Sequence, residues 1–521
     1  MNKKLSPYYP GIILFVFTLI VTLFTYKDYG IAWDETRQRE IGDISYNYVF
    51  KGDKALLTYP YGYYGVGLEL PLTCIEKWCN LTDTRDVYLM RHVVTHLLFL
   101  VSALAMYVLS YRLFRNKFLA CLGFMLLVFA PRLYAHSWFN SKDIPFLSVF
   151  TITLAFCEVA FRKNKPLLFL LLGLLSGYTT SIRIMGIMLG LFILAFLVID
   201  LVNNVLKKEK PANTLFSLAL FFSGFCGIVY AAWPYLWRSP LHNFINSFAK
   251  LSHYEWNGSV LMGGKMLQST QLPWSYFPNW FLISNPELWL IAGFTGFVLI
   301  AVAFIRKPID YIKSTPERNF ILYLLCFAAP IFSVLALHSV IYDDWRHLYF
   351  IYPSFILMAL YAINRLLATG LFAKKNYRLA LEGICVLQVL GTGWFMVKNH
   401  PFQQVYFNNL VSHNDEYLRK NYEMDYWGVS NLQALKYVLD NDAGRNIMVS
   451  TIYPDIMQNN VDMLEEEDRN RLKIVHPDSC QYFITNFRFH PDDFPMKEEY
   501  SFHVLNSSVI RIYAMRTIVV K

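Results

Sequence analysis

The sequence predicts an α-helical membrane protein that crosses the bilayer about eleven times and ends in a small extracytoplasmic α/β domain. Hydrophobic residues make up 55% of the 521 residues and charged residues only 16%, whereas soluble domains are about 25% charged. Apolar runs of membrane-spanning length recur through most of the chain, and basic residues occupy alternate loops between them. These three observations indicate a polytopic membrane protein rather than a soluble globular one.

The apolar runs define the predicted membrane helices, each of which needs about 20 residues. They are residues 8–26, 87–111, 117–133, 144–161, 166–180, 184–203, 213–235, 281–305, 319–338, 347–368 and 379–397. The first run has no small-residue cleavage site behind it, so we expect a membrane anchor rather than a signal peptide. Three longer and more polar segments remain outside the membrane: residues 27–86, residues 236–280 and the chain from 398 onwards.

Basic residues in the short loops predict the orientation of these helices. Lys3 and Lys4 precede the first run, and further basic residues follow every second run: Arg112, Arg115, Lys117, Arg162, Lys163, Lys165, Lys207, Lys208, Lys210, Arg306, Lys307, Lys313, Arg318, Lys374, Lys375 and Arg378. Cytoplasmic loops carry such an excess of Lys and Arg. We therefore expect a cytoplasmic N-terminus and an extracytoplasmic C-terminal part. Because these loops hold much of the net charge of +9, we expect no nucleic-acid partner.

The chain after residue 398 resembles a small soluble domain in composition. Candidate strands lie at residues 446–451, 482–486 and 509–514, and a candidate helix lies at 431–440. We therefore predict two domains. The first is a transmembrane domain of residues 1–398, which includes the outer loops 27–86 and 236–280. The second is an extracytoplasmic α/β domain of residues 399–521.

The most informative residues for function follow the first apolar run. Asp34 and Glu35 lie a few residues beyond it and are not needed to anchor a membrane helix. A carboxylate at the membrane face can take a proton from a hydroxyl group, so Asp34 is a candidate general base. The same pair would also suit the start of a helix that runs toward Tyr48, as a cap followed by an acid in the first turn. The sequence leaves both interpretations open.

Other ionisable side chains are predicted on the same side of the membrane. They are Lys142 and Asp143 before the fourth run, Arg183 after the fifth, and Arg346 and His347 before the tenth. Charges near membrane depth cost about 2.5–3.5 kcal/mol each, so they usually face a partner or a wet cavity. We predict that Asp34 acts with Glu35 and Asp143 as helpers. We predict that the remaining four, Lys142, Arg183, Arg346 and His347, bind a phosphate that leaves with negative charge.

Each of these residues also has a structural interpretation. Lys142 and Asp143 could cap the fourth membrane helix, and Arg183 could extend along the helix surface to lipid phosphates. Arg346 and His347 could anchor a helix at the membrane interface beside Trp345. The functional prediction therefore depends on the shared side of the residues rather than on any one of them.

Several short motifs occur in a fixed order along the chain. They are Trp33-Asp34-Glu35, Asn140-Ser141-Lys142-Asp143, Ser181-Ile182-Arg183, Pro273-Trp274-Ser275-Tyr276, Tyr342-Asp343-Asp344-Trp345-Arg346-His347 and Asp425-Tyr426-Trp427-Gly428. In this order and on one side of the membrane they resemble the GT-C membrane glycosyltransferases. The similar branch contains the protein O-mannosyltransferases and the lipid A aminoarabinose transferase. The resemblance covers most of the membrane part of the chain.

The resemblance implies a GT-C-like fold and an inverting glycosyltransferase. Such an enzyme moves a hexose or pentose from a polyprenyl-phosphate donor to an acceptor hydroxyl at the outer face of a membrane. The acceptor is left open between a glycolipid, a polysaccharide and a protein, and the branch suggests the bacterial inner membrane, where membrane lipids surround the helices. Asp34 matches the first-loop catalytic aspartate of the family and Asp143 the acid that supports it. Lys142 and Arg183 match cations near the lipid phosphate.

Two points stay open within this resemblance. A divalent metal ion between Asp34 and Asp143 occurs in some branches and is not decided by the sequence. The stretch from Gly65 to Leu72 stands where many relatives have a His or Lys followed by prolines. This departure leaves the acceptor side of the pocket undetermined.

A transporter or a lipid or glycan flippase is the alternative from another functional class. Such a protein needs ionisable residues deep within its membrane helices along an access path. Residues 167–175 and 187–198, in the middle of two runs, are almost wholly apolar. The concentration of charges at one face therefore favours surface chemistry over passage through the membrane.

Overall fold

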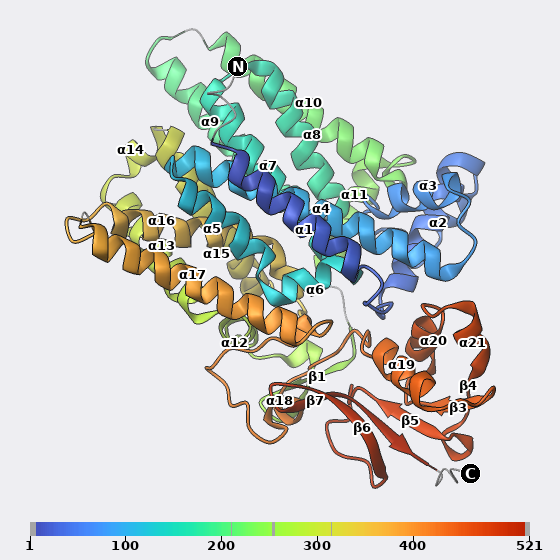
Figure 1. The fold of residues 1–521 in the computed structure, drawn as a ribbon. Coiled ribbons are helices and arrows are strands. Elements are labelled where there is room, and N and C mark those ends of the chain that lie inside the picture. Colours follow the sequence, from blue (N-terminus) through green and yellow to red (C-terminus); the bar gives the residue numbers. More distant parts are fainter. Residues whose placement is uncertain (1–6, 210, 253–255, 314, 373, 516–521) are drawn as a thin grey trace.

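The computed structural model describes residues 7–209, 211–252, 256–313, 315–372 and 374–515, so Lys3, Lys4 and Lys210 lie outside the described residues. A helical bundle occupies one part of the molecule and a smaller α/β domain packs at one end of it (Figure 1). The first helix, α1 (Tyr9–Thr25), begins toward the other end of the bundle. The fold class predicted from the sequence, a polytopic helical membrane protein with a small C-terminal α/β domain, is confirmed.

Within the described ranges, eight helices are long and apolar enough to cross a membrane. They are α4 (Thr84–Phe114), α7 (Asp143–Lys163), α9 (Ile187–Leu206), α10 (Ala212–Ala232), α13 (Glu287–Arg306), α15 (Thr315–Ala336), α17 (Lys375–Lys398), and α16 (Tyr352–Leu367) together with the 3-10 turn Arg346–Ile351 that precedes it. The pair α5 (Lys117–Val128) and α6 (Pro131–Phe139), bent by 57°, makes a ninth, and α1 (Tyr9–Thr25) and α8 (Pro166–Ile182) are shorter apolar helices. Each of the eleven predicted runs coincides with one of these segments.

Most predicted boundaries differ from the structure by a few residues, and proline explains two of the differences. The third run breaks at Pro131, which starts α6 and cannot donate a backbone hydrogen bond to the preceding turn. The eighth run was expected to begin at residue 281, but α13 begins after Pro286. The residues before it form the separate helix α12 (Tyr276–Ile283).

Small residues bring α8 and α10 close together. A Cβ atom on Gly173 would lie 2.2 Å from the Phe221 carbonyl oxygen, and one on Gly224 would lie 2.6 Å from the Leu170 carbonyl oxygen. Glycines at such positions allow the backbones of membrane helices to approach closely. The crossing therefore fixes α8, whose C-terminal end leads into Arg183.

The C-terminal domain is built on a five-stranded mixed sheet in the order β4-β3-β5-β7-β6. Its strands are β3 (Ile447–Ser450), β4 (Leu472–Ile474), β5 (Tyr482–Thr485), β6 (Lys497–Val504) and β7 (Ser507–Ala514). β3 runs parallel to β4 and β5, whereas β7 is antiparallel to β5 and β6. Helices α19 (Asn431–Asn441), α20 (Pro454–Val461) and α21 (Glu466–Arg471) accompany it. The three predicted strands correspond to β3, β5 and β7, and the predicted helix to α19.

The two long polar segments of the membrane part also fold. The first forms α2 (Glu35–Lys51) and α3 (Glu69–Trp78), and the second forms α11 (Pro240–Ser252), the hairpin β1 (Ser259–Met262) and β2 (Lys265–Gln268), and α12. Met262 in β1 makes an isolated bridge with Tyr422, in the segment that precedes the first long helix of the C-terminal part. These segments lie toward the end of the bundle that faces the C-terminal domain (Figure 1), so the polar chain of both parts meets there.

Candidate active site

A cavity of about 670 Å³ lies where the polar segments meet the C-terminal domain. Five of the seven predicted site residues line it directly: Asp34, Lys142, Arg183, Arg346 and His347. The other two, Glu35 and Asp143, are buried behind its wall. The C-terminal domain contributes residues from the segments 426–427, 455–459 and 488–489 to the same wall. Residues far apart in the sequence thus line one polar cavity.

Asp34 stands immediately before α2, which begins at Glu35. Its side chain makes no capping hydrogen bond, although the capping interpretation of the sequence placed it correctly at the start of a helix. The carboxylate is 46% exposed, and its Oδ2 lies 3.4 Å from Nη1 of Arg346. Asp34 therefore presents a carboxylate to the cavity instead of using it to terminate the helix.

Glu35 points away from the cavity and stabilises the turn that carries Asp34. Its carboxylate accepts a hydrogen bond of 2.8 Å from the backbone N–H of Ala32 and lies 3.1 Å from Nε2 of His92. The backbone N–H of Trp33 donates to the carbonyl of Trp427 at 3.0 Å. The turn is thus held from the membrane part on one side and from the C-terminal domain on the other.

Arg346 lies at the centre of the charged groups. Its Nη1 is 3.4 Å from Asp34 and 3.5 Å from Asp143, and its Nη2 is 3.3 Å from Asp343. The guanidinium carbon lies 4.7 Å from the centre of the Trp427 ring. The side chain is only 5% exposed, so the interpretation of Arg346 as a membrane-interface anchor does not describe its position.

Asp143 connects Arg346 to a second cation. The residue is the first of α7, and its carboxylate forms an ion pair with Arg183 and accepts a hydrogen bond of 2.9 Å from Asn140 Nδ2. The helix cap that the sequence suggested for Lys142 and Asp143 is supplied by Asn140, whose Oδ1 accepts from the Asp143 N–H at 2.8 Å. Asp143 is therefore available to orient two arginines.

Lys142 lies on the cavity wall with its ammonium group over an aromatic ring. Its Nζ is 3.4 Å from the centre of the Tyr64 ring. Burial and the neighbouring Arg183 lower the pKa of Lys142 to about 7, against the opposing effect of the nearby carboxylates. Lys142 therefore changes its charge near neutral pH, where the arginines do not.

Glycines between the first two membrane helices hold the segment that leads to Arg183. A Cβ on Gly65 would lie 2.2 Å from the Ser181 carbonyl oxygen, and the N–H of Gly67 donates to that oxygen at 3.0 Å. Only glycine permits this approach. The stretch that departs from the family pattern thus packs against the end of α8.

Glu69, at the start of α3, anchors the other side of the same wall. It is buried, forms an ion pair with Arg91, and accepts a hydrogen bond of 2.6 Å from the Ser141 hydroxyl. Ser141 precedes Lys142, so Glu69 holds the turn that presents the lysine. The sequence alone gave no signal for this pairing because the two residues are far apart along the chain.

His347 lines the cavity next to an aromatic wall that the sequence did not predict. Its ring lies 4.8 Å from that of Tyr342 in an edge-to-face arrangement, and Tyr342 stacks on Trp256 at 4.3 Å. Tyr342 and Trp427 occur within motifs that carry the family resemblance, but Trp256 belongs to none. The aromatic rings narrow the cavity beside the cations.

The residues around Asp34 and Asp143 do not fit a divalent metal ion. Calcium and magnesium take six or more oxygen ligands or retain several waters, whereas both carboxylates here face Arg346 and Asp143 also faces Arg183. Among the described residues, no group of three or more His, Cys, Asp and Glu side chains is arranged to hold a metal. The guanidinium groups of Arg183 and Arg346 occupy the positions beside these carboxylates that a metal ion would take.

The middle of the membrane part is similar to a known protein family. The model of the dolichyl-phosphate-mannose-protein mannosyltransferase family matches residues 89–226. The predicted resemblance to this glycosyltransferase branch is confirmed. The matched segment contains Lys142, Asp143 and Arg183, while Asp34 and Arg346 lie outside it. No curated protein sequence matches the chain.

Solved structures that are similar to the chain include two of one protein. ArnT from Cupriavidus metallidurans bound to undecaprenyl phosphate has 13% sequence identity and a TM-score of 0.48, with coverage of 96% of this chain and 97% of that chain. The apo state of the same protein has 13% identity and a TM-score of 0.46, with the same coverage.

We predict that Arg346→Met lowers the free energy of unfolding by about 3 kcal/mol, because Asp34, Asp143 and Asp343 each lose a cation of a buried ionic network. Thermal unfolding in detergent, followed by tryptophan fluorescence, measures this. Arg378→Met is the matched control, because Arg378 pairs with Glu382 at an exposed site and should change stability by less than about 1 kcal/mol. Equal unfolding midpoints for native protein and Arg346→Met would contradict the prediction.

Proposed function

We propose that the protein is an inverting glycosyltransferase that moves a sugar from a polyprenyl-phosphate donor to an acceptor hydroxyl, with Asp34 as general base. The observation that carries the proposal is the half-exposed carboxylate of Asp34 on a cavity wall that also holds Lys142, Arg183 and Arg346. A transfer of this kind needs a base for the hydroxyl proton and fixed cations for the phosphate that leaves. The match to a mannosyltransferase family supports the same reaction class.

The proposed reaction is a single displacement at the anomeric carbon. The acceptor oxygen gives its proton to Asp34 and attacks the anomeric carbon from the side opposite the phosphate. The bond between that carbon and the phosphate oxygen breaks, and the phosphate keeps the electron pair and gains negative charge. Lys142 and Arg183 stabilise that charge, while Arg346, fixed by Asp143 and Asp343, holds the base and the phosphate in register.

The proposed orientation places this cavity on the outer face of a bacterial inner membrane. The positive charge of the alternate loops supports a cytoplasmic N-terminus, and the cavity lies at the opposite end of the bundle from the start of α1. The acceptor reaches Asp34 from the aqueous side, between α2 and the C-terminal domain. The donor lipid lies among the membrane helices with its phosphate at the cations.

The interior of the bundle favours this reaction over transport. Directly beyond Asp143, successive turns of α7 carry Phe146 and Phe150, which pack against Phe350 with ring centres 4.7 Å and 5.3 Å away. All three rings are buried in the main apolar core. Apolar packing thus continues along this part of α7 directly beneath the cavity.

We expect Asp34→Asn to lower the rate of transfer by about 10²–10⁴-fold, the usual contribution of a general base. Mass spectrometry of envelope lipids, polysaccharides and glycoproteins measures the outcome in a strain that lacks the gene. A sugar-sized mass should return with the native chain and with the control Asp86→Asn, which alters an exposed carboxylate near the start of α4. Full restoration by Asp34→Asn would show that Asp34 is not the base.

We expect kcat/KM for the donor to fall as pH rises above about 7, because the pKa of Lys142 is lowered to about 7 and only the protonated form is a cation. Lys142→Arg should move this decline to higher pH, since an arginine keeps its charge. Lys142→Met should reduce kcat/KM at pH 6 and abolish the decline. A decline at the same pH in Lys142→Arg would assign it to another group.

A further inference from the structure

Two consecutive aspartates before Arg346 adopt a backbone conformation that needs support. Asp343 and Asp344 have φ values of 57° and 61°, in the left-handed region that residues other than glycine adopt only when their surroundings hold them there. Asp344 is held within the interior by Arg132 at 3.2 Å and by the hydroxyls of Tyr349 and Tyr426 at 2.8 Å and 2.7 Å. Asp343 is the one of the two aspartates that contacts Arg346 through an ion pair.

Asp343 is held by an arginine from the C-terminal domain. Its Oδ2 faces Arg346 at 3.3 Å, while its Oδ1 accepts a hydrogen bond of 2.7 Å from Nη2 of Arg488. Arg488 follows β5, 145 residues later in the chain. One carboxylate therefore joins a cation of the candidate active site to a cation of the α/β domain.

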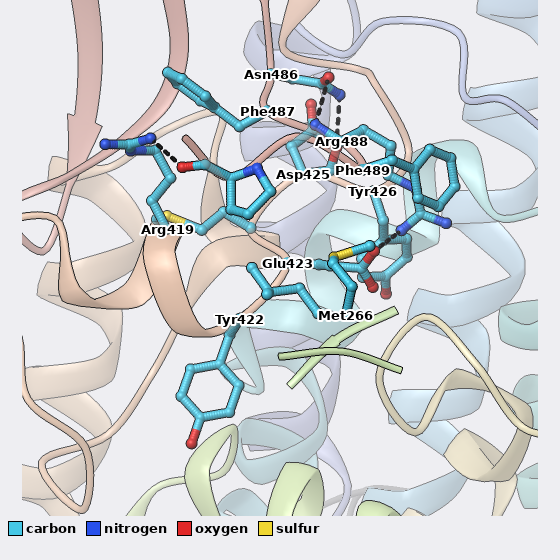
Figure 2. A pocket seen from close by; sticks show the side chains of 13 residues that line it. Met266, Arg419, Tyr422, Glu423, Asp425, Tyr426, Asn486, Phe487, Arg488 and Phe489 are labelled. Atoms are coloured by element: carbon cyan, nitrogen blue, oxygen red, sulfur yellow. Dashed lines mark hydrogen bonds and ion pairs between the residues drawn. The ribbon is translucent and has the colours of Figure 1, made fainter. Parts of the chain in front are cut away.

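The position of Arg488 is defined on every side. Its Nη1 donates to Glu423 at 2.5 Å, and its guanidinium carbon lies 4.3 Å from the ring centre of Phe489. Figure 2 shows Arg488 directed toward Glu423, with Asn486 joined to Asp425 on the other side of the loop. Arg488 is 6% exposed and lines the large cavity. It is thus a fixed donor in that wall.

Arg511, another arginine of the same domain, has different ion-pair partners from Arg488. Arg511 pairs with Asp493 at 2.6 Å and with Glu498 at 3.1 Å, both within the C-terminal domain. Arg488 instead pairs with both parts of the molecule: its Nη1 donates to Glu423 in the C-terminal domain and its Nη2 donates to Asp343 in the membrane part. Burial raises the pKa of Glu423, and the neighbouring Arg488 opposes that shift.

We propose that Arg488 is a positioning residue for the transfer reaction, which holds Asp343 so that Arg346 faces Asp34 and Asp143. This inference rests on the proposed function. Docking of the C-terminal domain is then a condition for an assembled active site, because the domain supplies the group that orients the central arginine. Lys142 and Arg183 do not contact Asp343 and keep their places without it.

The test compares Arg488→Met, Arg488→Lys and the matched control Arg511→Met in the full chain. The rate of transfer is measured in membranes that contain the native donor pool, by the product mass. Binding of a polyprenyl phosphate is measured separately by native mass spectrometry in nanodiscs. We expect Arg488→Met to slow transfer by about tenfold to a hundredfold, since a displacement of about 1 Å in a reacting group has effects of this size. Binding of the polyprenyl phosphate should persist, and Arg488→Lys should recover part of the rate.

A second variant covers the case in which Arg488→Met does not fold. The double variant Glu423→Met/Arg488→Met removes the carboxylate that would be left buried without a partner, an exchange that proteins often tolerate. We expect it to fold and to transfer as slowly as Arg488→Met. A native rate in either variant, or an equal loss of rate in Arg511→Met, would overturn the proposal. Full activity of Asp34→Asn would instead overturn the proposed function itself.

Discussion

The candidate site depends on the position of one buried guanidinium group. Arg346 contacts Asp34, Asp143 and Asp343 within 3.5 Å, and each of these carboxylates comes from a different segment of the chain. A buried cation is stable only when its partners are close and well oriented. The start of α2, the start of α7 and the loop before α16 must therefore converge on Arg346, and the other residues of the cavity take their places around it.

This convergence explains why polar segments at one end of the bundle are so extensively folded. Glu35 closes the turn before α2, Asn140 caps α7, and Glu69 holds the turn that carries Lys142. None of the three faces the substrate in the proposed reaction. Their contribution is to fix the directions of side chains that do, so that the charges of the cavity are organised before a substrate enters. The C-terminal domain takes part in the same network through Arg488.

Much of the architecture followed from residue type and spacing. The apolar runs predicted all the membrane helices because a bilayer imposes a length and an apolar composition on every segment that crosses it. Strands β3, β5 and β7 were predicted from buried apolar residues. Strand β6 was not, because its first four residues are exposed and polar and it is defined by its pairing with β7. Within the site, the sequence predicted that Asp34, Lys142, Arg183 and Arg346 act together, because all four are expected on the same side of the membrane.

The sequence by itself determined the membrane class, the order of the apolar segments, and the set of charged residues at one face. It could do so because solvation by lipid acts locally, on each segment in turn. Only the tertiary structure decided which carboxylate is presented and which is used to build the turn, since Asp34 and Glu35 are adjacent and chemically alike. It also decided the role of Arg488, because an ion pair between residues 145 positions apart leaves no periodic or local signal in the chain.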